Sequence, residues 1–164
     1  MNPAGDPVRV PVAFFDTMQL ACPLAVLATV ALGVPAVEMN VPFEGGVTAT
    51  LFTAYGGERV KWGAALCTVL AVLLLAVVRD APRGSPRRSL GIVVALASFF
   101  SGVFVAHAAY RLGFTPLSGL ETLPRTAAYI GAFAGLGFAL LGFARLSRFG
   151  EPEPKPAPPE VTES

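Results

Sequence analysis

Four long runs without a charged residue limit the folds that this chain can adopt. The runs cover residues 17–37, 62–78, 89–110 and 126–144, with lengths of 21, 17, 22 and 19 residues. A helix rises about 1.5 Å per residue and the hydrocarbon core of a bilayer is about 30 Å thick, so runs of this length can cross a membrane. A soluble helical bundle would need charged outer faces, which these runs do not provide. The second run is the shortest, and Val60 and the stem of Lys61 extend it.

The composition agrees with a membrane protein. Of the 164 residues, 54% are hydrophobic and only 14% are charged, against about 25% charged in soluble domains. The net charge of +1 gives no basic excess for binding nucleic acid. We therefore predict an all-α integral membrane protein, a four-transmembrane-helix bundle with a short extracytoplasmic cap segment and a disordered cytoplasmic tail. The expected helices cover about residues 17–37, 60–78, 89–110 and 126–145 of a transmembrane domain at 1–148, and the tail covers 149–164.

The arginines indicate which side faces the cytoplasm. The connector at residues 79–88 carries four arginines, and short cytoplasmic loops are the ones that retain basic residues. Four spans then place both termini in the cytoplasm. The first run is expected to span rather than to be cleaved as a signal peptide, because it is longer than a typical signal h-region. The Ala-, Gly- and Arg-rich alphabet indicates a bacterial source, so we expect a multi-pass protein of the plasma (bacterial inner) membrane.

Two segments outside the runs have a distinctive composition. The tail FGEPEPKPAPPEVTES has five prolines and alternating charges, which predicts an extended, disordered end or a docking peptide for a proline-binding partner. Residues 45–57, GGVTATLFTAYGG, are uncharged between two glycine pairs and too short to span. This segment could form a strand, a helix or a re-entrant loop. A cap on the outer face is favoured over a pore loop, since unpaired backbone is costly in lipid.

Small residues recur every three or four positions in three of the runs. Such stripes allow helix backbones to approach closely in a membrane. The stripe of the fourth run comprises Ala128, Gly131, Gly135, Ala139 and Gly142, that of the third includes Ser98, Gly102 and Ala106, and the first offers Ala21, Ala25, Ala28 or Thr29, and Gly33. Packing within the chain is the simpler interpretation. A homo-oligomer or a partner subunit is the alternative, with the fourth helix as the first candidate for an outer interface.

Residues that could carry catalysis are scarce. The chain has one histidine and two cysteines, and it contains no HExxH, GxSxG or Walker motif. Cys22 and Cys67 are expected near opposite leaflets as free thiols. The sequence therefore predicts no catalytic residue, no metal site and no cofactor-binding residue, and it leaves the cofactor unknown.

Two sets of residues are candidate sites. An outer set gathers the aromatic and basic residues expected on the extracytoplasmic side, as an aromatic belt or as a vestibule for a ligand or partner. This set comprises His107, Tyr110, Arg111, Trp62, Tyr55 and Tyr129. An inner set comprises Asp16, Thr17 and Gln19, where Asp16 either caps the first helix or belongs to a polar site.

These features predict a non-catalytic accessory or scaffolding subunit of a larger membrane complex. The alternative is a small homo-oligomeric transporter or channel that uses the outer vestibule. An enzyme acting on a lipid or quinone is a third class, for which no constellation of residues is present. The expected partners are the lipid bilayer and other membrane subunits or a second copy of the chain, and no nucleic acid.

Overall fold

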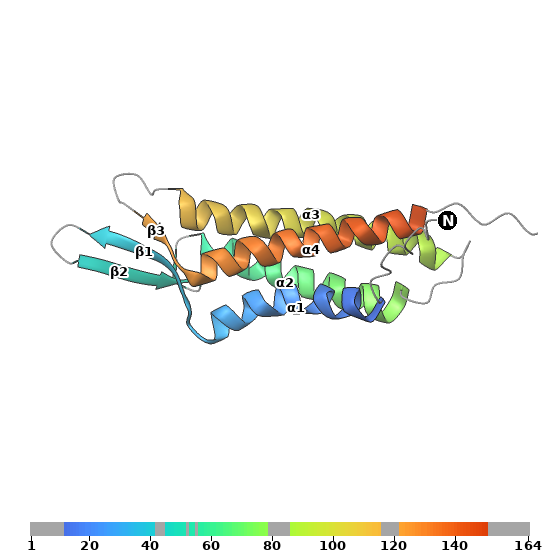
Figure 1. The fold of residues 1–164 in the computed structure, drawn as a ribbon, viewed down its shortest axis with the longest axis horizontal. Helices are drawn as coiled ribbons and strands as arrows, with labels where there is room; N and C mark the ends of the chain where they lie inside the picture. The colour runs from blue at the N-terminus through green and yellow to red at the C-terminus, as the bar shows by residue number, and fades with distance from the viewer. Residues whose placement is uncertain are drawn as a thin grey trace, which may run out of the picture.

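Four long helices lie side by side, with a small sheet at one end (Figure 1). The computed structural model describes residues 12–41, 45–51, 53–54, 56–78, 86–115 and 122–150. The elements are α1 (Val12–Ala31), β1 (Pro35–Val41), β2 (Gly45–Thr50), α2 (Gly57–Leu73), the π-helical turn η1 (Leu74–Val78), α3 (Pro86–Phe114), β3 (Thr122–Pro124) and α4 (Thr126–Gly150). Each of the four helices has a stretch long and apolar enough to cross a membrane. The prediction of a mostly helical bundle with four candidate spans is confirmed.

The first helix lies earlier in the chain than predicted. It begins at Val12 and ends at Ala31, whereas the uncharged run indicated residues 17–37. Gly33 has a positive φ of 62°, its N–H donates to the Val30 carbonyl at 3.3 Å, and the Val34 N–H donates to Thr29 at 2.9 Å. These two bonds form a Schellman motif, which closes a helix with a glycine in the left-handed conformation. The predicted bounds of this helix were wrong because backbone hydrogen bonds end the helix near Gly33, whereas the uncharged run continues to residue 37.

The other helices extend past their predicted limits. Helix α3 has 29 residues, and Arg87, Arg88 and Arg111 lie within its terminal turns. Helix α4 continues to Gly150. Arginines that end an uncharged run can still be helical, because their long stems cross the interface while the charged group stays in water. At about 1.5 Å per residue, α3 is about 43 Å long and exceeds the hydrocarbon thickness.

The sheet at one end of the bundle joins the α1–α2 connection, which contains β1 and β2, to the α3–α4 connection, which contains β3. β1 is central and pairs antiparallel with β2, where Val37 lies opposite Ala49, and with β3, where Glu38 lies opposite Leu123. Residues 45–50, whose conformation the sequence left open, are thus a strand, and β3 was not predicted. Gly56, with φ of 87°, then turns the chain into α2. Phe52 and Tyr55 lie outside the described residues.

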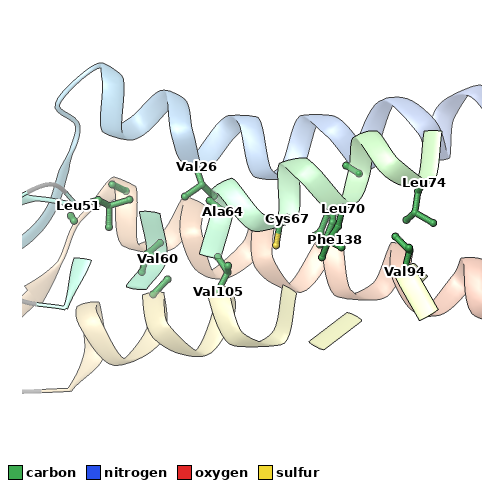
Figure 2. Packing of buried hydrophobic residues seen from close by; sticks show 14 of the residues in the cluster. Val26, Leu51, Val60, Ala64, Cys67, Leu70, Leu74, Val94, Val105 and Phe138 are labelled. Carbon is green, nitrogen blue, oxygen red and sulfur yellow. The ribbon is translucent and has the colours of Figure 1, made fainter. Parts of the chain in front are cut away.

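A continuous apolar core runs along the bundle from the sheet to the opposite end (Figure 2). It begins at Leu51, which is fully buried under the sheet, and continues through Cys67 to Phe138 and Leu74. Every helix and the sheet contribute to this core. The intervening members include Val26, Val60, Ala64, Leu70, Val94 and Val105.

Helices α3 and α4 make the closest backbone contact. A Cβ atom added to Gly102 would lie 2.5 Å from the Ala139 nitrogen, and one added to Gly135 would lie 2.5 Å from the Ala106 nitrogen. The whole predicted stripe of α4 is buried: Ala128, Gly131, Gly135, Ala139 and Gly142. Packing within the chain therefore accounts for this stripe. It is not available as an outer interface, contrary to its choice as the first candidate.

Replacing Gly135 by alanine should destabilise the bundle, since the new methyl group would meet backbone atoms that cannot move aside. We expect a loss of about 1–3 kcal/mol in the free energy of unfolding. Gly137→Ala is the matched control, because its Cβ would meet only the Cys22 sulfur, at 3.3 Å. Denaturation of the detergent-purified proteins would measure both. Equal stability of the two variants would contradict this view of the contact.

Candidate functional site

Three polar side chains meet where α1 packs on α4, at the end of the bundle opposite the sheet. The guanidinium of Arg145 forms an ion pair with Asp16 through Nη2 and Oδ1, and its Nε donates to Gln19 Oε1 at 3.4 Å. Asp16 and Gln19 are three residues apart and therefore share one face of α1. We call these three residues the polar cluster.

The polar cluster is buried. The side chains of Asp16 and Arg145 are only 11% and 12% exposed, and Gln19 is 0% exposed. A buried charge is costly unless it is paired and hydrogen-bonded, and the planar fork of arginine can reach two acceptors at once. The amide Nε2 of Gln19 is buried and has no acceptor within the described chain. The cluster therefore holds α1 against α4 and retains capacity for one more acceptor.

The polar cluster corrects two expectations about Asp16. This residue does not precede its helix as a cap, because α1 begins at Val12 and places it in the second turn. It is also paired with Arg145, which was not among the candidate site residues predicted from the sequence. A sequence signal for the pair existed: an acid near the start of the first helix and a base near the end of the fourth must lie at the same end of an antiparallel bundle. Thr17, the remaining inner candidate, is exposed.

A second ion pair lies at the sheet end of α4. Arg125, directly before the helix, pairs with Glu38 of β1, and its backbone N–H donates to the Ala36 carbonyl at 2.9 Å. The side chains of Arg125 and Glu38 are 49% and 20% exposed, so this pair is more solvated than the polar cluster. The α1–β1 segment is thus bonded to both ends of α4.

The aromatic residues of the outer set divide between two places. Tyr110 stacks on Phe114 with ring centroids 5.1 Å apart, and Tyr129 meets the same ring edge-on at 5.4 Å, which joins α3 to α4. Trp62 instead lines a groove between α2 and α3. Phe114 was not predicted, because the outer set was chosen from the tyrosines, the tryptophan and their basic neighbours.

The other members of the outer set are His107, Arg111 and Tyr55. His107 and Arg111 are exposed on α3. Tyr55 lies outside the described residues. The aromatic residues of the outer set therefore lie in two places, one beside α4 and one in the α2–α3 groove, and not in the single group that the sequence indicated.

The remaining chemistry-bearing groups are the two cysteines and the side chains that could bind a metal ion. Among the described residues, no group of three or more His, Cys, Asp or Glu side chains could hold a metal ion. Cys22 and Cys67 are free, and each is the eleventh residue of its helix. Both thiols thus lie near mid-helix, so their expected placement near opposite leaflets was wrong, because α1 starts before its uncharged run.

Comparisons with protein-family models, with curated proteins and with solved structures give no match. The function is therefore inferred from the geometry of the chain itself.

Breaking the buried ion pair should weaken the bundle strongly. We expect Asp16→Asn or Arg145→Gln alone to cost about 3 kcal/mol of unfolding free energy, because each leaves a buried charge without its counter-charge. The double variant should recover part of this loss. The measurement is denaturant unfolding in micelles.

Glu58→Gln is the control for this prediction. The Glu58 carboxylate lies 3.6 Å from Lys61 and its side chain is 70% exposed, so its loss should cost less than about 1 kcal/mol. A parent-like stability of both single variants of the buried pair would show that the pair does not hold α1.

Proposed function

We propose that the protein is a non-catalytic multi-pass membrane protein that serves as an accessory or scaffolding subunit of a larger membrane complex. Its partner would be a transmembrane helix of another subunit, or of a second copy, packed on the outward face of α1. The proposal depends chiefly on one observation, the difference in side-chain size between the outward faces of the four helices.

The outward face of α1 is made mainly of small residues. Its exposed positions are small at Thr17, Ala21, Ala25, Ala28 and Ala31, and two large side chains lie beside them, Phe14 at 51% and Leu24 at 49%. The other helices expose large side chains, such as Val69 at 56%, Phe100 at 65% and Phe133 at 70%. Lipid tails are as apolar as leucine, so membrane helices associate where small side chains allow close backbone packing. The small residues of α3 and α4 are used inside the bundle, which leaves α1 as the helix that a partner can approach closely.

The arrangement of the ends supports the proposed orientation. The start of α1 and the end of α4 lie together, away from the sheet (Figure 1). Arg87 and Arg88 lie in the first turn of α3, which begins at that same end. Cytoplasmic loops retain basic residues. We therefore place this end in the cytoplasm of a bacterial cell, and the sheet as the extracytoplasmic cap.

A small homo-oligomeric transporter or channel is the second candidate. The observation in its favour is the Asp16–Arg145 pair, because ionisable residues inside membrane helices commonly mark ion or substrate pathways. Its expected outer vestibule gains no support, since Trp62 and the Tyr110–Tyr129 group lie on different sides of α3.

Enlarging the α1 face should separate the protein from its complex. The tagged parent, purified from its native membrane in mild detergent, should retain a partner subunit in fixed stoichiometry. Ala25→Leu should lose that partner while it keeps the parent's unfolding midpoint, because the added side chain blocks close approach without touching the core. Ala76→Leu, at an exposed position of η1, is the matched control and should retain the partner.

One result would reject the proposed contact on α1, and another would reject the scaffold. Retention of the partner by Ala25→Leu would exclude the α1 face. A pure homo-oligomer that passes solute in liposomes, with flux abolished by Asp16→Asn, would favour the transporter.

A further inference from the structure

A groove of about 470 Å³ opens between the sheet-side halves of α2 and α3. Trp62, Leu66 and Phe104 form its apolar walls, and Trp62 and Phe104 are 66% and 49% exposed. Gly63 forms the floor, where a Cβ atom would lie 2.7 Å from Val105 of the facing helix. The absence of a side chain at Gly63 therefore lets α2 approach α3 closely behind the groove.

The groove runs from a charged end to an apolar end. Glu58 and Arg59 lie at the start of α2, and Leu66 and Ser101 line the deeper part. Arg59 and Leu66 are seven residues apart, or about 10 Å along the helix. With α2 across the membrane, Arg59 would lie at the headgroup level and Leu66 among the acyl chains. The long axis of the groove is thus parallel to a lipid chain.

Among the described residues at the charged end, one carboxylate, Glu58, lies beside two basic side chains, Arg59 and Lys61. The carboxylate of Glu58 lies 3.6 Å from the Lys61 ammonium. In the part of the chain that the structure describes, the guanidinium of Arg59 has no ion-pair partner. Basic residues beside transmembrane helices attract anionic lipid headgroups. A ligand that fits the whole groove therefore needs a negative group at the charged end and an alkyl chain between the apolar walls.

We propose that this groove binds one anionic phospholipid, with an acyl chain between Trp62 and Phe104 and the phosphate against Arg59. Its size and apolar lining, with few polar groups, fit the general character of small-molecule sites. The groove lies on α2 and α3, whereas the proposed subunit contact lies on α1. The lipid site therefore does not depend on the proposed function.

Trp62 is the only tryptophan of the chain, so its fluorescence reports the groove directly. Detergent-purified protein would be titrated with phosphatidylglycerol carrying brominated acyl chains, which quench tryptophan on contact, and separately with phosphatidylcholine carrying the same chains. Half-quenching should require about fivefold less of the anionic lipid. Arg59→Gln should abolish this preference. Arg111→Gln, an exposed arginine of α3 that does not line the groove, should retain it.

A second variant separates the groove from general contact with lipid. Ser101→Phe should fill the deeper part and raise the concentration of both lipids needed for half-quenching, with an unchanged unfolding midpoint. Equal quenching by the two lipids in the parent would overturn the proposal, as would a preference that survives Arg59→Gln or parent-like quenching of Ser101→Phe. Loss of the α1 partner would affect none of these readouts, so failure of one proposal is distinguishable from failure of the other.

Discussion

The close contact of α3 with α4 is the interaction on which the rest of the bundle depends. Between helices in a bilayer, burial of apolar surface provides little driving force, because lipid tails solvate leucine as well as another helix does. Close van der Waals packing of the two backbones must therefore supply the attraction, and Gly102 and Gly135 allow this close approach. The resulting pair presents Val105 and Phe138 to the interior, where α2 and α1 complete the core.

The attachment of α1 follows a different physical rule. Its small residues face outward, and polar bonds to α4 hold its segment at both ends of the bundle. The Asp16–Arg145 pair contributes mainly by what its loss would cost, since either charge alone would be buried in an apolar setting. The Glu38–Arg125 pair is partly solvated and aligns β1 with the start of α4. This division leaves the small residues of α1 exposed on the outside of the bundle.

The sequence predicted the parts of the structure that depend on local composition. Uncharged length identified four candidate spans, and the spacing of small residues identified residues of α3 and α4 that pack closely, without pairing these two helices. It could not place the helix ends, because Gly33 ends α1 through backbone hydrogen bonds within a run that stays uncharged. The strand β3 has only three residues and forms by pairing with a distant segment. The partner of Asp16 lies 129 positions away, and only the topology brings the two together.

The outward face of α1 and the α2–α3 groove differ in shape and charge, as a protein helix and a lipid would require. A protein helix gains from a smooth, small-residue face, because its own side chains fill the space and its backbone can approach. A lipid has a thin flexible chain and a charged head, so it gains from a slot with a charge at one end. Helix α1 has the first surface, and the α2–α3 groove beside Arg59 has the second. Because α1 and the groove occupy different helices, one bundle can hold a protein partner and an anionic lipid at the same time.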